Sequence, residues 1–121
     1  MAAAEPTVYK LLTAAITASA GTSAPIRAEG RQLISFYFSS TGTTSSGTFL
    51  IEEAYYPPDE PVYAGTWSLI QTVLASAFTG GAQIAYHLNP TALASFRVRQ
   101  TVNVGGGGSV DCYAIVYDKP F

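Results

Sequence analysis

The fold of this chain is decided by the stretch FRVRQTVNVGGGGSVDCYAIVY, residues 96–117. Residues 96–104 alternate between apolar and polar side chains, with Gln100 as the one break, as is typical of a half-buried antiparallel strand. Residues 110–117 are apolar on both alternating faces, which predicts a strand that is either central in its sheet or covered by a partner. The glycine run between them, residues 105–108, predicts a hairpin turn.

Other segments show the same alternation and are separated by turn signals at regular spacing. Residues 34–39, 49–53, 67–73 and 83–88 are predicted strands, and residues 8–18 are a strand favoured by β-branched residues over a helix favoured by alanines. We therefore expect one all-β domain, residues 1–121, folded as a single antiparallel β-sandwich, jelly-roll-like, with about eight strands. The expected core comprises Trp67 as an anchor with Phe36, Phe38, Ile84, Phe96, Val98 and Val116.

The composition indicates a protein that assembles with copies of itself. Only 12% of the 121 residues are charged, against about 25% in an ordinary soluble domain, so neighbouring copies repel one another weakly. The net charge is −2 and the six basic residues are scattered, which argues against a nucleic-acid partner. Because no stretch approaches the ~18 apolar residues of a membrane span, we expect no membrane partner either. A homo-oligomer is the expected state.

One connection is unusually rich in tyrosine and proline. Residues 54–65, AYYPPDEPVYAG, hold three tyrosines and three prolines. Prolines favour extended polyproline geometry, and tyrosines supply a large contact area at low entropic cost. The segment is either a plain loop lying on its own sandwich or an arm that reaches a neighbouring molecule, and we favour the arm. The expected interface residues are Tyr55, Tyr56, Pro57, Pro58 and Tyr63 of the arm, with Phe121 at the chain end.

No group of residues in the sequence forms a catalytic constellation. His87 is the only histidine, and no nucleophile can be assigned to it. Cys112 has apolar neighbours and is expected to be a buried thiol. Glu52 and Glu53 point to opposite faces of one strand, so they cannot act as a carboxylate pair. We therefore expect no enzyme activity, no metal and no cofactor.

Two arginines on one strand face need partners. Arg97 and Arg99 lie two residues apart, so their side chains project in the same direction. Their expected partners are the carboxylates of Glu52 or Asp111 on a neighbouring strand, or acidic groups of another molecule.

A series of ordered features along most of the chain carries a family resemblance. They are Leu11-Leu12-Thr13-Ala14, Gly21-Thr22-Ser23-Ala24, Gly30-Arg31, Gly47-Thr48-Phe49-Leu50-Ile51-Glu52-Glu53-Ala54, Thr66-Trp67-Ser68, Phe96-Arg97-Val98-Arg99 and the glycine run. In these features the chain resembles small β-sandwich virion proteins of tailed bacteriophages and prophages. The arm replaces the short turn that usually follows the Glu-Ala strand in such proteins.

The resemblance implies a non-enzymatic virion structural protein, most plausibly a capsid decoration (cement) protein that stabilises the shell. Its implied partners are the major capsid protein or other virion proteins, and its implied location is the capsid surface after synthesis in the host cytoplasm. Two alternatives stay open: a carbohydrate-binding module of a tail or fibre, using the tyrosines at 55, 56 and 63, and a neck or tail ring component.

Overall fold

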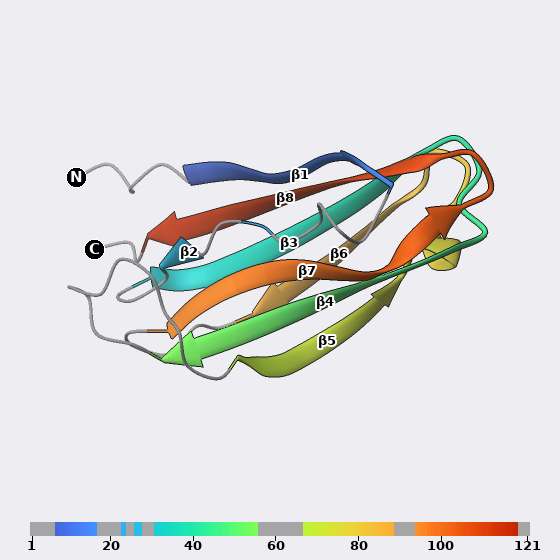
Figure 1. Cartoon of the computed structure of the whole chain (residues 1–121). Helices are drawn as coiled ribbons and strands as arrows, with labels where there is room; N and C mark the ends of the chain where they lie inside the picture. The colour runs from blue at the N-terminus through green and yellow to red at the C-terminus, as the bar shows by residue number, and fades with distance from the viewer. Residues whose placement is uncertain are drawn as a thin grey trace.

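Two antiparallel sheets packed face to face form the protein. A computed structural model of the chain describes residues 7–16, 23, 26–27, 31–55, 67–88 and 94–118. One sheet has the strand order β1-β8-β3-β6 and the other β2-β7-β4-β5 (Figure 1). The strands are β1 (Thr7–Ala15), β2 (Ile26–Arg27), β3 (Arg31–Thr41), β4 (Ser46–Tyr55), β5 (Ser68–Leu74), β6 (Gln83–Leu88), β7 (Ala94–Gly105) and β8 (Ser109–Asp118). The predicted β-sandwich is confirmed.

Seven of these strands make the body of the sandwich, because β2 is only two residues long. It pairs with Phe96 and Ser95 of β7, and Ser23 extends the contact by donating its backbone N–H to the Val98 carbonyl at 2.8 Å. Strand β2 was not predicted, because two paired residues leave no alternating pattern in the sequence. A short 3₁₀ helix, η2 (Ala75–Phe78), was also not predicted; it lies at the end of the sandwich that follows β5 (Figure 1).

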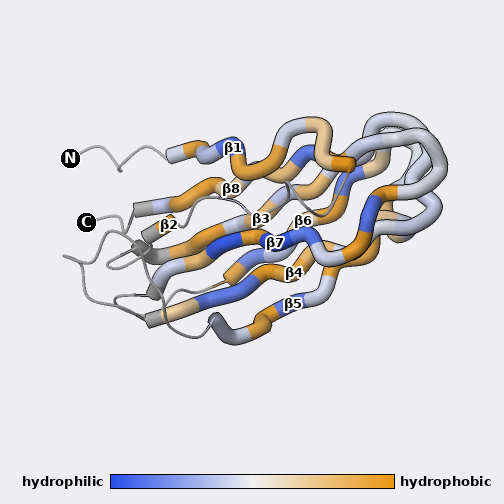
Figure 2. Tube along the Cα trace, viewed as in Figure 1, coloured by the Kyte–Doolittle hydropathy of each residue, from blue (hydrophilic) through white to orange (hydrophobic). Residues whose placement is uncertain are grey.

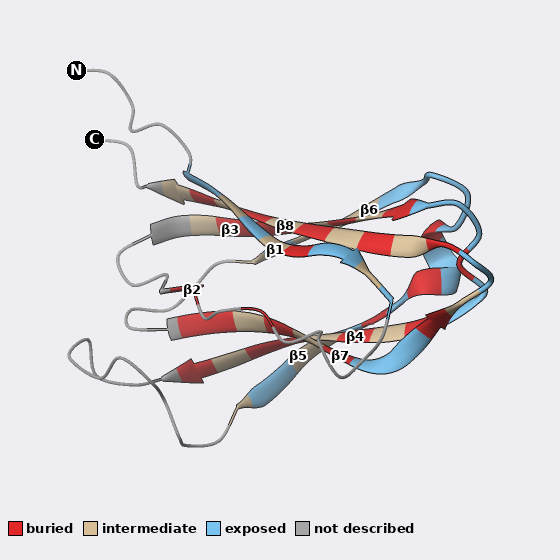
Figure 3. Ribbon diagram, turned by 45° about the horizontal axis from the view of Figure 1, so that its top comes forward, coloured by how far each residue is buried: buried red, intermediate tan, exposed pale blue. Residues whose placement is uncertain are grey.

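The core lies between the two sheets, and buried residues alternate with more accessible ones along the strands of both layers (Figure 3). Phe36 of one sheet contacts Phe96 of the other with ring centroids 6.0 Å apart, and Phe38 contacts Phe49 at 5.8 Å. Aromatic pairs at such distances add to the free energy of apolar burial. The predicted core residues Phe36, Phe38, Phe96, Val98 and Val116 are buried, and Ile84 packs against the core while partly exposed.

The polar break at Gln100 coincides with an irregularity of strand β7. Gln100 is buried opposite Phe49, and its amide donates to the carbonyl of Ile16 at 2.9 Å. The register of β7 against β4 shifts on both sides of Val102, which pairs with Thr48. Val102 therefore points outward and is 46% exposed, although the alternation places it with the inward residues.

The glycine run is not a hairpin turn, contrary to the prediction. Strands β7 and β8 lie in different sheets, so residues 105–108 cross from one layer to the other. The run packs against the loop after β3: the Gly108 N–H donates to the Thr43 carbonyl at 2.8 Å. A side chain at Gly108 would place its Cβ 2.5 Å from the carbonyl oxygens of Thr41 and Thr43, so only glycine fits there.

Candidate interaction surface

The outer face of the β1-β8-β3-β6 sheet gathers aromatic and apolar side chains. Residues of each strand alternate between the core and this face, because side chains in a strand point to opposite sides in turn. The outward residues of β8 include Tyr113, Ile115 and Tyr117, all of them half-buried. With the outward side chains of its neighbours they form what we call the tyrosine face: Val8, Lys10, Leu33, Ser35, Tyr37, Ser39, Gln83, Ala85, His87, Asp111, Tyr113, Ile115 and Tyr117.

Two tyrosines stand side by side at the centre of the tyrosine face. Tyr37 of β3 and Tyr113 of β8 are direct cross-strand partners. Together with Val8, Gln83 and Ile115 they line a shallow hollow of about 220 Å³. Half-burial restricts both rings before any ligand arrives, which lowers the entropic cost of binding to them.

His87 supports the edge of this arrangement. Its ring contacts that of Tyr37 edge-on, with centroids 6.1 Å apart, and its Nδ1 shares a hydrogen bond with the Ser35 hydroxyl at 2.7 Å. The imidazole is exposed and its described contacts hold Tyr37 in place. His87 is thus a surface histidine that contacts two outward side chains of β3.

The tyrosine face carries little charge. The Lys10 ammonium lies 5.5 Å from the centroid of the Tyr113 ring, within cation–π range. Asp111 is engaged locally, since its Oδ1 accepts the backbone N–H of Ala14 at 2.8 Å. Ala14 has φ of 48°, at an irregularity of edge strand β1, so Asp111 stabilises a backbone conformation that a non-glycine residue rarely adopts.

The sequence of β8 predicts a strand that is either central in its sheet or covered by a partner, and the structure shows the first of these. Strand β8 lies between β1 and β3 and is therefore central in its sheet. Its core face, Val110, Cys112, Ala114 and Val116, is fully buried. The opposite face remains partly accessible to solvent in the single chain, so being central does not by itself account for its apolar character.

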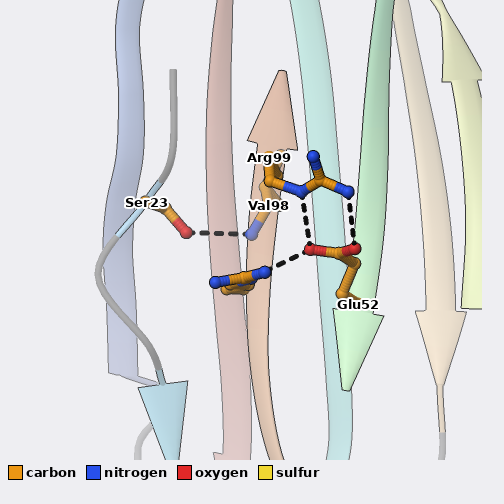
Figure 4. A network of polar contacts seen from close by, with 5 residues as sticks. Ser23, Glu52, Val98 and Arg99 are labelled. Atoms are coloured by element: carbon orange, nitrogen blue, oxygen red, sulfur yellow. Dashed lines mark hydrogen bonds and ion pairs between the residues drawn. The ribbon is translucent and has the colours of Figure 1, made fainter. Parts of the chain in front are cut away.

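The outer face of the other sheet is different, because it carries an ion-pair network that we call the ionic face (Figure 4). Glu52 of β4 accepts hydrogen bonds from Arg97 Nε at 2.9 Å and from Arg99 Nε and Nη2 at 3.2 and 3.1 Å. The Glu52 side chain is 6% exposed, against 23% for Arg97 and 40% for Arg99. Figure 2 shows the corresponding hydrophilic stretches on β4 and β7. Of the expected acidic partners, Glu52 is confirmed, and Asp111 lies on the other sheet.

The network shifts the titration of its own groups. Burial alone would raise the pKa of Glu52, but the hydrogen bonds and charges of Arg99 and Arg97 outweigh it and hold that pKa below its ordinary value. The hydrogen bond to Glu52 raises the pKa of Arg99 in spite of partial burial. Glu52 is therefore ionised at neutral pH, and its charge is matched within the chain.

Trp67 belongs to the ionic face and not to the core, so its prediction as a core anchor is wrong. The centroid of its ring lies 4.4 Å from the guanidinium carbon of Arg97, and the residue is partly exposed. A flat aromatic ring over a guanidinium is favourable on electrostatic grounds and shields the ion pair from water. A tryptophan that directly precedes edge strand β5 thus contacts the ion-pair network on the outside of the sheet.

The remaining predicted site residues have several outcomes. Tyr55 is the last residue of β4, so the arm extends from a strand end. Tyr56, Pro57, Pro58, Tyr63 and Phe121 lie outside the described residues, and their role in an interface stays a prediction. Cys112 is buried as expected, and burial raises the pKa of its thiol. Glu53 points away from Glu52 and lines a hollow at the arm-bearing end with Phe96, Ile70 and Leu88.

The tyrosine face was not predicted, although the sequence contains a signal for it. The alternation in 34–39 and 110–117 assigns Tyr37 and Tyr113 to the side opposite the core. That they face each other depends on the pairing of β3 with β8, two strands far apart in sequence. The local pattern contains no information about that pairing.

No protein-family model matches the chain, and no curated protein is significantly similar to it. Among the described residues, no group of three His, Cys, Asp or Glu side chains is placed to hold a metal ion. Over those same segments, no helix is long and apolar enough to cross a bilayer.

Proposed function

We propose that this chain is a non-enzymatic structural protein of a bacteriophage virion, specifically a capsid decoration protein that binds the outer shell as a homo-oligomer. The observation that carries the proposal is the tyrosine face. A neutral, aromatic surface on a central strand is what an assembling subunit needs, because aromatic anchors in a buried interface dominate the binding energy.

The strand pairing supports a jelly-roll reading of the sandwich. Strand β1 pairs with β8, β2 with β7, β3 with β6 and β4 with β5. We infer that the chain is one long hairpin folded across itself, the arrangement shared by viral capsid and lectin domains. Fold alone does not define function, so this analogy supports the proposal only together with the surface.

Low surface charge is the second support. Eight acidic and six basic residues are spread over the chain, and on the ionic face Glu52 pairs with both Arg97 and Arg99, which leaves that group with a single net positive charge. Copies of such a subunit can be packed densely on a shell with little repulsion. In this proposal the partners are the major capsid protein or other virion proteins, and the arm and the chain ends make contacts.

The test uses particles that lack this protein. Purified parent protein is added to them, and its occupancy on the shell is measured by cryo-electron microscopy and by the ratio of protein bands. We expect specific occupancy by the parent and its loss in Tyr37→Thr/Tyr113→Thr and in Tyr55→Ala/Tyr56→Ala/Tyr63→Ala variants. The matched control is Leu69→Ser/Val102→Ser, which removes two side chains that are 57% and 46% exposed outside the tyrosine face. A parent that never binds particles would overturn the proposal.

A second candidate function is favoured by one specific observation. The paired rings of Tyr37 and Tyr113 beside the Gln83 amide form a shallow aromatic platform, to which a sugar ring could stack and hydrogen-bond. A carbohydrate-binding module would be retained on a polysaccharide column as a monomer. Retention that disappears in the Tyr37→Thr/Tyr113→Thr variant, with no binding to particles, would favour this function over shell decoration.

A further inference from the structure

The hollow on the tyrosine face and the arm, which follows strand β4 of the other sheet, have complementary chemistry. We propose that residues 56–63 of one copy dock into the hollow lined by Tyr37 and Tyr113 of the next copy. This inference rests on the proposed assembly of the chain into an oligomer. It identifies which surface receives the arm.

Shape is the first argument. The segment YPPDEPVY, residues 56–63, has three prolines, which favour a polyproline II conformation. Such segments dock in shallow grooves lined by aromatic rings, because the extended chain is already ordered before binding. The hollow offers two adjacent tyrosine rings, with Val8 and Ile115 as its apolar walls.

Hydrogen bonding is the second argument. A polyproline II segment makes no internal hydrogen bonds, so its carbonyl groups are free to accept. The hollow contains one side-chain amide, that of Gln83, which is exposed at the start of β6. An amide beside two tyrosine hydroxyls supplies donors for those carbonyls without introducing a charge.

Charge is the third argument. Asp59 and Glu60 lie at the centre of the segment, which contains no basic residue. Lys10 is exposed, and its ammonium lies over Tyr113, beside the hollow. Asp111, the acidic side chain described on the same face, is occupied by the N–H of Ala14. The arm is thus anionic where the receiving face presents a cation.

The arm cannot reach the hollow of its own chain. Tyr56 directly follows Tyr55 at the end of β4, and Tyr63 is four residues before Trp67, so their Cα atoms lie within about 4 Å and about 14 Å of the Cα atoms of Tyr55 and Trp67. The hollow is on the outside of the other sheet. A path round the β5–β6 edge to the pair of β3 and β8 spans the ~10 Å between sheets and about two strand spacings of ~4.8 Å from β5 or three from β4, roughly 20–25 Å in all. Docking must therefore occur between copies.

Each copy then has one arm and one hollow, on different parts of its surface. Such a contact is heterologous, and repeating it produces a closed ring or an open chain of copies. It also predicts complementation. A copy without a working arm and a copy without a working hollow should form one heterodimer, which has no further contact to extend.

The experiment mixes two full-length variants and measures mass by analytical ultracentrifugation. The arm variant is Tyr56→Ala/Tyr63→Ala, which leaves Tyr55 in its strand. The hollow variant is Tyr37→Thr/Tyr113→Thr. We expect the parent to associate, each variant alone to be monomeric, and the equimolar mixture to form a heterodimer and nothing larger.

A second hollow variant tests the contact in case the double tyrosine variant misfolds. Gln83→Glu changes an exposed side chain by almost nothing in size and places a negative charge where Asp59 and Glu60 would dock. We expect it to raise the concentration needed for half-association roughly tenfold or more. Thr101→Glu, which adds the same charge at an exposed position of β7, should leave association unchanged.

Several outcomes would overturn the inference. They are a hollow variant or Gln83→Glu variant that associates like the parent, a mixture with no heterodimer, and association that depends on the hollow but not on the arm. The last result would indicate face-to-face pairing of two copies. If heterodimers form but the parent does not bind particles, the proposed function fails and the arm contact stands. If the parent occupies particles without complementation, the reverse holds.

Discussion

The two outer faces of the sandwich satisfy their side chains in different ways. On the ionic face, the carboxylate of Glu52 receives three hydrogen bonds from Arg97 and Arg99, and Trp67 lies over one of the guanidinium groups. The tyrosine face has side chains of similar size, but Tyr113, Ile115 and Tyr117 are only half-buried. One face is therefore largely completed within the chain, whereas the other gains most from burial by another molecule.

This difference indicates that the ionic face contributes to the stability of the single chain and the tyrosine face to its association. A buried ion pair is costly to break within one chain, because removing one partner leaves the other charge uncompensated. Outward tyrosines contribute little to the fold of the single chain, yet they supply contact area to an interface. Substitutions on the ionic face should therefore affect unfolding, and substitutions on the tyrosine face should affect association.

Among substitutions on the two outer faces, the largest effect on stability is expected for Glu52→Ala. Removal of the carboxylate leaves the charges of Arg97 and Arg99 unpaired beside the sheet. Because these two side chains are 23% and 40% exposed, water recovers part of the cost. We expect a loss of about 2–3 kcal/mol, below the 3–5 kcal/mol of a fully buried pair. Urea unfolding measures it, and an unchanged midpoint would show that the network adds nothing to stability.

The next effect is a dependence of the free energy of unfolding on pH, caused by titration of the Glu52 carboxylate. The pKa of Glu52 is lower in the folded state than in the unfolded chain, where it is about 4.3. The stabilisation of the folded state by ionised Glu52 is therefore complete above that unfolded-state pKa. It declines as the pH falls below that value and is lost below the folded pKa. The stability difference between the parent and Glu52→Gln should thus narrow on going from about pH 6 to about pH 3. Other carboxylates titrate in both proteins and cancel, so a constant difference would contradict the lowered pKa.

The sequence predicted the layers of this fold better than the role of particular residues. Alternation located the long strands, because burial of one face imposes a period of two. It placed Val102 inside, because a register shift beside Gln100 changes the direction of later side chains and leaves no separate signal. The glycine run gives the same signal for a hairpin and for a crossing between sheets. Which of these occurs depends on pairing between distant strands.

Trp67 shows a further limit of sequence reasoning. A lone tryptophan at the start of a strand was assigned to the core on hydrophobicity, but its large ring covers Arg97 instead. The tyrosine face was not predicted for a similar reason. The alternation placed Tyr37 and Tyr113 outside the core, and only the pairing of β3 with β8 brings them together as partners.

Trp67→Ala should therefore have a smaller effect than truncation of a core aromatic. The ring is partly exposed, and its centroid lies 4.4 Å from the guanidinium carbon of Arg97. Loss of a cation–π contact and of part of its buried area should cost about 1–2 kcal/mol. Phe38→Ala, which empties a fully buried site, should cost about 3–5 kcal/mol and serves as the comparison. Equal losses of free energy of unfolding in the two variants would show that Trp67 acts as a core residue.

The smallest effect on stability, and the sharpest test of the comparison, is expected for Tyr37→Thr/Tyr113→Thr. Threonine keeps a high β propensity, so the double variant loses little more than a cross-strand pair worth about 1 kcal/mol or less. The unfolding midpoint should be measured at a concentration where the parent is monomeric, since association would stabilise the parent by mass action. At higher concentration the parent should gain stability and the variant should not. A large loss for the dilute monomer would mean that the tyrosine face, like the ionic face, is completed within the chain, and the division between the two faces would no longer hold.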